Sequence, residues 1–335
     1  MDSILLDSIL LDSTLLDSIL LDQREIESII QLANQIAASP NENPELFCQQ
    51  AKQLSIHLPT NIREHITQLS KCAAILIKTI PVDPATIPTT PNGNTYSQGE
   101  TTMLAKIQAL CINVIGEMIA YEAEGYGRLF QDIVPLQTMS TAQTSLGSAA
   151  ELEIHTEQAF SNLRPDILSL ACLRGNTEAF TYILPVETIL QNLPEDDVKL
   201  LFQPLWKIGV DLSFKLNGNE FVDGDIRGPI AILSGPREDP VLTFDQDLMT
   251  GITEKANELL RQIIEIYYQH RISHNLQPGE MMFINNNRAV HGRSPFRPNY
   301  DGYDRFLVRC FATTHYEKSL YARPQNSRTV AAIYS

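Results

Sequence analysis

Hydrophobic positions in the first third of the chain follow a helical spacing. Apolar residues recur three and four positions apart, and Pro, Asn and Ser residues separate one such segment from the next. We expect four helices with this pattern, at residues 25–38, 44–54, 61–80 and 100–123. The apolar stripe along the fourth segment is typical of a helix face that packs on a core.

From about residue 150 the pattern changes to short apolar runs bounded by turn residues. These predicted strands are residues 167–175, 180–186, 228–235, 240–245, 279–286 and 306–314. One predicted helix, residues 252–273, interrupts them. Several short strands with turn signals between them indicate a sandwich or barrel. We therefore expect one domain over residues 23–335, mainly helical to residue 125 and a mostly β core with flanking helices from residue 126.

The beginning of the chain follows neither pattern. Residues 2–21 repeat the sequence DSILL four times, with Thr14 in place of one Ile. A period of five matches neither the helical period of about 3.6 nor the strand period of about 2. We interpret residues 1–22 as a tail that is dispensable for the fold. The alternative is self-association through its Leu and Ile side chains.

Composition narrows the class of protein. The chain has 335 residues, of which 43% are hydrophobic, enough for a large core. Its formal net charge of −15 argues against binding to nucleic acids or anionic membranes. The five scattered cysteines, without a CxxC pair, indicate reduced thiols. The sequence has neither an apolar run of about 18 residues nor the basic start of a signal peptide, so we expect a cytoplasmic protein.

Candidate metal ligands lie at two places in the sequence. In LEIHTEQAF, residues 152–160, His155 and Glu157 are two positions apart, so in a strand both side chains reach one point in space. His291 lies in a polar turn after a predicted strand. Two histidines and one carboxylate are the ligands of non-haem Fe(II) oxygenases. Two alternatives remain open: polar residues on a solvated face, and a zinc site, although the HExxH motif of zinc hydrolases is absent.

A basic residue makes this pattern more specific. Arg305 stands fourteen positions after His291, at the start of a predicted strand, where a guanidinium can bind a carboxylate through two parallel hydrogen bonds. The motifs HTE, HGRSPF and RFLVR together resemble the clavaminate synthase-like Fe(II)/2-oxoglutarate-dependent dioxygenases, which include hydroxylases of free arginine, asparagine and lysine. The resemblance covers roughly residues 100–320. It implies a double-stranded β-helix, or jelly roll.

The resemblance also implies roles for individual residues. It makes His155, Glu157 and His291 the ligands of Fe(II). Arg305 becomes the partner of the distal carboxylate of 2-oxoglutarate, with Thr181 as a second contact to that carboxylate. Halogenases of the family carry a small residue in place of the metal carboxylate, so the presence of Glu157 favours hydroxylation.

The same resemblance proposes a substrate site. Arg309 matches the position that binds the substrate α-carboxylate, and Glu124 lies near the position that contacts the α-amino group; a surface arginine and a helix end are the alternatives. Asp245 and Asp247, which we expect on one face of a strand, resemble the acidic pair that grips the guanidinium of arginine. Alternatively, one of the two carboxylates only caps a turn. Residues 126–150, rich in Gly, Ser and Thr, are predicted to form a mobile lid.

The sequence therefore predicts an Fe(II)- and 2-oxoglutarate-dependent hydroxylase that acts with O2 on a free cationic amino acid. Arginine or a cyclic arginine derivative such as enduracididine is the first candidate. Lysine, asparagine, and desaturation or ring closure on the same scaffold are alternatives. A jelly-roll binding module without catalytic activity is the alternative from a different class. The sequence predicts neither the carbon attacked nor the oligomeric state.

Overall fold

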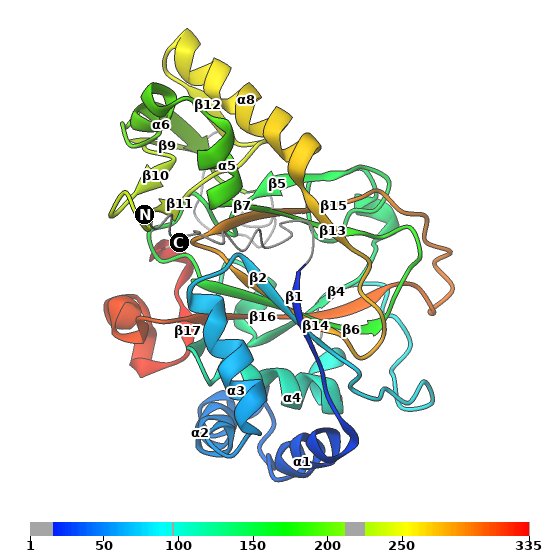
Figure 1. The fold of residues 1–335 in the computed structure, drawn as a ribbon. Helices are drawn as coiled ribbons and strands as arrows, with labels where there is room; N and C mark the ends of the chain where they lie inside the picture. The colour runs from blue at the N-terminus through cyan, green and yellow to red at the C-terminus, as the bar shows by residue number, and fades with distance from the viewer. Residues whose placement is uncertain (1–15, 96, 212–224, 335) are drawn as a thin grey trace, which may run out of the picture.

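A large antiparallel-rich sheet forms the centre of the molecule (Figure 1). The computed structural model describes residues 16–95, 97–211 and 225–334. The sheet has eight strands, seven of them in the order β1-β2-β14-β6-β16-β3-β17, with β4 paired to β16. Their bounds are β1 Asp17–Leu20, β2 Ala74–Lys78, β3 Glu117–Tyr121, β4 Phe130–Ile133, β6 Ile167–Arg174, β14 Met281–Asn285, β16 Phe306–Thr313 and β17 Thr329–Val330.

A smaller sheet lies opposite the large one and carries the candidate metal ligands. Its four strands run in the order β13-β7-β15-β5. Their bounds are β5 Leu152–His155, β7 Thr181–Pro185, β13 Ile272–His274 and β15 Ala289–Arg293. A cluster of buried side chains from both sheets, among them Leu170, Ile183 and Leu307, fills the space between them. Two sheets packed through alternating inward side chains are the expected jelly roll, and the prediction of a mostly β core is confirmed.

Helices cover the other face of the large sheet. They are α1 Gln23–Asn34, α2 Pro44–Ser55, α3 Thr60–Thr67 and α4 Met103–Ile112. Asp22, Asn43 and Thr102 cap the first, second and fourth of these helices by accepting a backbone N–H, which explains where each begins. Phe47, Leu110 and other buried side chains join these helices to the sheet in one core. No helix among the described residues is both long and apolar enough to cross a membrane.

Two predicted helices are too long. The segment 61–80 is helical only to Thr67 and, after a short 3-10 turn, continues as strand β2; the segment 100–123 contains α4 and then strand β3. Both strands belong to the large sheet, so the β core begins before residue 126, within a segment that is otherwise mainly helical. The segment 126–150 likewise contains β4, which pairs with β16. The long stretch after β4, residues 134–150, lies outside the sheet and is available as a cover.

The last DSILL copy is part of the fold. Asp17 to Leu20 form β1, which pairs in parallel with β2 at the edge of the large sheet, and Leu21 is buried in the core beneath it. Asp22 then caps α1 through a capping box with Glu25. The expected boundary after residue 22 is wrong, because residues 17–22 are integrated into the domain. Residues 1–15 lie outside the described residues.

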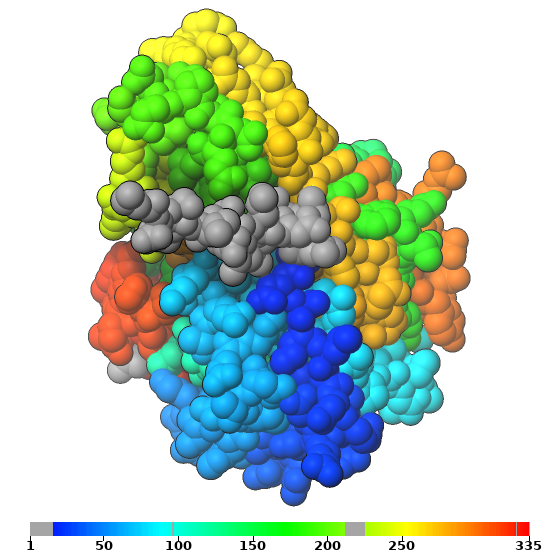
Figure 2. All heavy atoms as spheres, in the orientation of Figure 1, coloured from blue at the N-terminus to red at the C-terminus, as the bar shows by residue number. Residues whose placement is uncertain are grey.

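A second unit of helices and short strands follows β7. It contains the helices α5 Val186–Asn192, α6 Glu195–Leu201 and α8 Glu254–His270, and the strands β8 Trp206–Gly209, β9 Ile226–Ile230, β10 Leu233–Ser234, β11 Val241–Leu242 and β12 Met249–Gly251. The helix predicted at 252–273 is confirmed as α8, and only the first part of the segment 240–245 is a strand. Trp206 and Phe244 lie at the centre of its buried cluster. This unit forms the upper lobe in the space-filling view (Figure 2).

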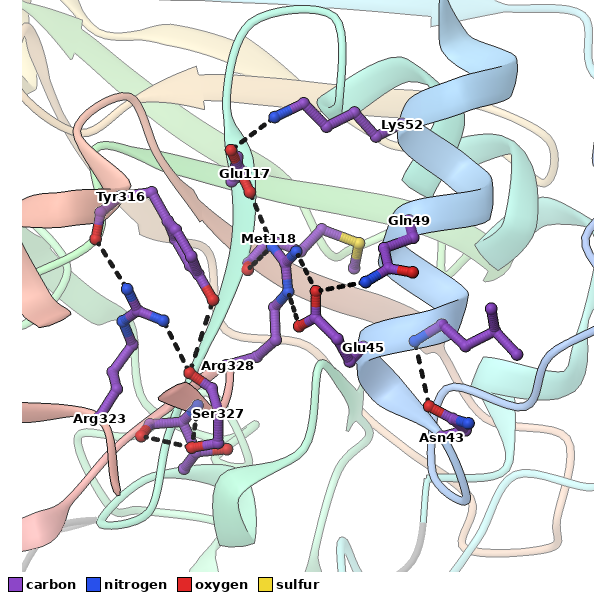
Figure 3. Close-up of polar contacts among 12 residues, drawn as sticks. Asn43, Glu45, Gln49, Lys52, Glu117, Met118, Tyr316, Arg323, Ser327 and Arg328 are labelled. Atoms are coloured by element: carbon purple, nitrogen blue, oxygen red, sulfur yellow. Dashed lines mark hydrogen bonds and ion pairs between the residues drawn. The ribbon is translucent and has the colours of Figure 1, made fainter. Parts of the chain in front are cut away.

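Ion pairs join the end of the chain to its beginning (Figure 3). The buried guanidinium of Arg328 donates to Glu45 on α2 at 2.9 Å and to Glu117 on β3 at 3.0 Å. Arg323 lies over the ring of Tyr316, with 3.6 Å from its guanidinium carbon to the ring centroid. These contacts fix the C-terminal segment across the edge of the large sheet, next to β17.

Candidate active site

The two candidate histidine ligands lie opposite each other on two neighbouring strands. His155 on β5 and His291 on β15 are directly opposite in the antiparallel register, with their ring centroids 4.5 Å apart. Glu157 lies in the turn that follows β5, two positions beyond the end of the strand. The expectation that Glu157 continues the strand is therefore wrong, but its carboxylate still converges with the imidazoles. The ligand atoms of the three residues all lie within 4.8 Å of one another.

A buried asparagine holds the backbone of Glu157. Asn286, which is fully buried, accepts the N–H of Glu157 at 2.7 Å and donates to its carbonyl at 3.0 Å. The same side-chain amide donates to the carbonyl of Pro165 at 2.7 Å. Asn286 was not predicted from the sequence, although its place between two other asparagines directly after a predicted strand was the available signal.

The protonation states of Glu157 and His291, and their atoms that lack a hydrogen-bond partner, fit the binding of a divalent cation. Oε2 of Glu157 and Nδ1 of His291 are buried without a hydrogen-bond partner. Burial opposes ionisation of Glu157, but Arg309 and His291 outweigh it and hold the pKa of the carboxyl below its usual range. Burial and the adjacent His155 lower the pKa of His291 to about 4, so its imidazole is neutral near pH 7. A carboxylate and neutral imidazoles are the ligands that Fe(II) takes in oxygenases.

His155, Glu157 and His291 line a cavity of about 230 Å³ between the sheets. Arg305 and Thr181 line it. Arg305 is 5% exposed, its pKa is lowered by burial to about 10, and it has no ion-pair partner among the residues that the structure describes. The hydroxyl of Thr181 is buried and without a hydrogen-bond partner. A buried cation and a free hydroxyl that line one cavity suit a carboxylate that enters from outside, as expected for 2-oxoglutarate.

Arg309 lines the same cavity and is already surrounded by acceptors. It forms ion pairs with Glu124 and with Glu157, the latter at 3.0 Å, and it also donates to Gln131. Its Nε remains buried without a partner. Burial raises the pKa of Glu124, and repulsion by Glu157 adds to this effect. Arg309 opposes the rise, but it is shared between the two carboxylates. Gln131 was not predicted from the sequence, because its position on β4 was assigned to the lid.

The predicted acidic pair lies in a turn rather than in a strand. Oδ1 of Asp245 accepts the backbone N–H groups of Asp247 and Leu248, at 3.0 and 2.8 Å. Both carboxylate residues nevertheless line the cavity, and Asp245 pairs with His155 through an isolated bridge. The strand expectation is wrong, and the alternative of a turn cap is correct for Asp245 without removing it from the site.

Two further carboxylates were missed by sequence analysis. Glu153, two positions before His155, and Asp211 both line the cavity. Burial, Asp247 and Glu151 raise the pKa of Glu153. The signal for Glu153 was available, since it lies at the same spacing from His155 as Glu157 does, on the other side.

The segment after β4 covers one side of the cavity. Met139, Gln143 and Leu146 line the cavity from this segment. Arg293, on the same strand as His291, donates to the carbonyls of Gly147 at 2.7 Å and Ala150 at 3.2 Å. The covering segment is thereby tied to β15, the strand of the candidate ligand His291. That it moves during the reaction stays a prediction.

The comparisons with known proteins agree with this geometry. Residues 221–311 match the model of the Taurine catabolism dioxygenase TauD, TfdA family. The chain is 44% identical over 315 residues to an L-lysine 3-hydroxylase of Catenulispora acidiphila, covering 93% of this chain and 88% of that one. It is 30% identical to an L-asparagine oxygenase of Streptomyces coelicolor, covering 92% and 93%. The chain belongs to the clavaminate synthase-like Fe(II)/2-oxoglutarate-dependent dioxygenases.

A solved structure supports the same assignment. The crystal structure of an asparagine oxygenase in complex with Fe(II), 3-hydroxyasparagine and succinate matches the dioxygenase with a TM-score of 0.86 at 30% identity, covering 94% of this chain and 99% of that one. The dioxygenase is thus an enzyme that uses Fe(II) and 2-oxoglutarate to hydroxylate a free amino acid. The alternative of a non-catalytic binding module is set aside. The identity of the amino acid requires a separate argument.

Proposed function

We propose that the dioxygenase hydroxylates C3 of free L-lysine. The observation that carries the choice of a cationic substrate is the set of carboxylates around the cavity. Among the described residues, Asp245, Asp247 and Glu153 line the cavity without an ion-pair partner. Asp245 is buried, Glu153 is half-buried and Asp247 is exposed. Asp247 repels both of the other carboxylates, and a cationic side chain relieves that repulsion.

The number of carboxylates supports an ammonium group. An ammonium offers three N–H donors in a tetrahedral arrangement, whereas a guanidinium offers a planar fork that suits two parallel acceptors. Adding Glu153 to the predicted pair Asp245 and Asp247 favours the tetrahedral cation. The 44% identity to an L-lysine 3-hydroxylase supports the same choice and the carbon attacked. This places lysine ahead of arginine and its cyclic derivatives, which had come first in the sequence-based expectation.

The residues of the cavity have distinct tasks in this proposal. His155, Glu157 and His291 hold Fe(II), and Arg305 with Thr181 holds the distal carboxylate of 2-oxoglutarate. When bound, the iron and this cosubstrate supply the oxidising power that breaks an unactivated C–H bond.

The amino-acid backbone of the substrate is held by a second group of side chains. Arg309, whose Nε lacks a partner, accepts the α-carboxylate as its counter-ion, and Glu124 binds the α-ammonium. Asp245, Asp247 and Glu153 then bind the ε-ammonium, so that the carbon chain of the substrate is held at both ends. Holding both ends orients one carbon toward the metal, and the covering segment excludes water.

The substrate assignment is tested with the purified enzyme, Fe(II), 2-oxoglutarate and single amino acids. We expect lysine to release the most succinate and its product to gain one oxygen atom. Preference for arginine would overturn lysine but keep the cationic class. Preference for asparagine or another neutral amino acid would overturn the class, and loss of two hydrogens would replace hydroxylation by desaturation.

The carboxylates are tested by substitution. Asp245→Asn with Asp247→Asn keeps the shape of the site and removes its charge. We expect kcat/KM for lysine to fall, and the fall should correspond to a loss of at least about 2 kcal/mol of transition-state stabilisation. This value is the lower range for the loss of charged hydrogen bonds. Uncoupled conversion of 2-oxoglutarate to succinate should persist, because the variant leaves iron and Arg305 in place. Normal turnover of lysine in the double variant would show that these carboxylates do not bind the substrate.

A further inference from the structure

The edge strand β1 is built from one unit of a repeated sequence. Asp17 to Leu20 pair with residues 75–78 of β2 in parallel register. Ile19 and Leu21 pack against the core beneath the sheet, and Asp17 approaches His65 at 3.6 Å. The sequence DSILL therefore has the ability to form a strand on this sheet, with its Ile and second Leu inward.

The outer edge of β1 is open among the described residues. There β1 pairs with β2 alone, at the end of the strand order. It contains no proline, lysine or bulge, three of the features by which edge strands avoid pairing with other chains, and its one charged side chain, Asp17, lies at the first of its four residues. Leu20, which is 67% exposed, places a large apolar side chain next to this open edge. Such an edge is a template for one more strand.

The chain carries three more copies of the strand-forming unit. Residues 2–16 contain DSILL twice and DSTLL once, directly before β1. Because the period of five is odd and a strand alternates with a period of two, consecutive copies in one continuous strand would point their Ile side chains to opposite faces. Each copy therefore suits a separate strand position rather than an extension of β1.

The composition of the repeat favours a strand from a second molecule. To return onto β1 within one chain, an upstream copy needs a tight turn, and two-residue hairpin turns require positive φ, which Gly at a central position supplies. Residues 2–21 contain only Asp, Ser, Ile, Leu and Thr. A copy that comes from another molecule needs no such turn. Two molecules that exchange one copy each form a closed pair with two equivalent contacts.

We propose that the outer edge of β1 binds a DSILL segment from a second copy of this chain, so that two molecules associate by strand addition. The added backbone pairs with the open groups of β1, and its Leu and Ile side chains cover Leu20. The repeat is then an association element that acts separately from the catalytic cavity.

The test measures the molar mass of the intact enzyme by sedimentation over a range of concentrations. Three variants accompany the parent: deletion of residues 2–16, which keeps β1; Leu20→Lys; and Ile56→Lys. Ile56 is 65% exposed at the end of α2, so this variant makes the same charge change with the same loss of exposed apolar surface away from the edge. We expect the parent and Ile56→Lys to reach twice the monomer mass, and the other two to remain monomeric with unchanged unfolding midpoints.

A synthetic peptide of residues 2–16 gives a second readout. We expect it to bind the deletion variant, and to bind that variant at least tenfold more weakly once Leu20→Lys is added. A parent that stays monomeric at every concentration overturns the proposal. If that monomeric parent also excludes the peptide while the deletion variant binds it, the chain's own upstream copies occupy the edge. If the parent is a dimer and either edge variant, the deletion of residues 2–16 or Leu20→Lys, is still a dimer, the interface lies elsewhere. This outcome also overturns the proposal.

Discussion

Asn286→Ala is the perturbation that most directly tests how the fold prepares the metal site. The side chain of Asn286 makes three hydrogen bonds, two with the backbone of Glu157 and one with Pro165, all in a fully buried position. At a net value of about 1 kcal/mol for each bond, the variant should lose about 3 kcal/mol of unfolding free energy. Because both backbone groups of Glu157 lose their partner, its carboxylate is no longer fixed toward His155 and His291.

The effect on the metal is separable from the effect on stability. Loss of an outer partner of a metal ligand typically costs about 10- to 100-fold in metal affinity, and we expect a value in this range for Fe(II). The measurements are anaerobic Fe(II) titration of the folded variant and urea unfolding of the metal-free protein.

The neighbouring Asn287→Ala is the matched control for this variant. It removes hydrogen bonds to Asp166 at 2.8 Å and Arg164 at 3.3 Å from the same turn, without a side-chain contact to Glu157. It should lower stability and leave iron affinity unchanged. Equal iron affinity in the two variants would refute the role of Asn286 as a positioning residue.

Three further predictions concern the ligands, the cosubstrate and the C-terminal segment. His291→Ala should abolish Fe(II) binding and turnover while circular dichroism stays that of the parent, since the ligands of an open site do not hold the core; full iron affinity would remove His291 from the site. Arg305→Ala should weaken the binding of 2-oxoglutarate by about 2 to 5 kcal/mol, measured through the apparent Kd, because a largely buried charge pair is lost. An unchanged Kd would show that another basic residue binds the cosubstrate. Arg328→Ala should lower the unfolding free energy near pH 7 by about 2 kcal/mol, because charged hydrogen bonds to Glu45 and Glu117 are lost. The folded-state pKa of each of these two carboxyls is lowered, so their contribution is present above the unfolded pKa and disappears as the pH falls through the folded pKa. Urea unfolding at several pH values should thus show a smaller acid-dependent loss of stability in Arg328→Ala than in the parent, and parallel curves would contradict this origin of the ion-pair energy.

The three residues of the candidate metal site could be picked out from the sequence because their chemistry lies in short local patterns. His155 and Glu157 are two positions apart, and His291 and Arg305 each border a predicted strand. The register that sets His155 opposite His291 follows from pairing between β5 and β15, which the sequence does not state. The long-range contact through Asn286 could not be predicted for the same reason, because it depends on a partner 129 positions away.

The two strands hidden in predicted helices show where local pattern fails. The run AILIK of β2 is apolar at every position but the last, so its periodicity does not distinguish a buried strand from a buried helix. Its state is decided by its neighbours, β1 from the repeat and β14 from the far end of the chain. A strand that is buried on both faces between such neighbours carries no alternation to reveal it.

Asp245 shows a different limit, because turn capping and ligand binding were weighed as alternatives and the fold combines them. The backbone N–H groups of Asp247 and Leu248 donate to one carboxylate oxygen, Oδ1, and thereby fix the side chain in one orientation. Its other oxygen takes no part in those two bonds, and the residue lines the cavity. A carboxylate that is already held by the backbone loses little rotational freedom when a cation binds. The turn that the sequence analysis treated as a reason to discount Asp245 is therefore a reason to expect that it binds substrate with little entropic cost.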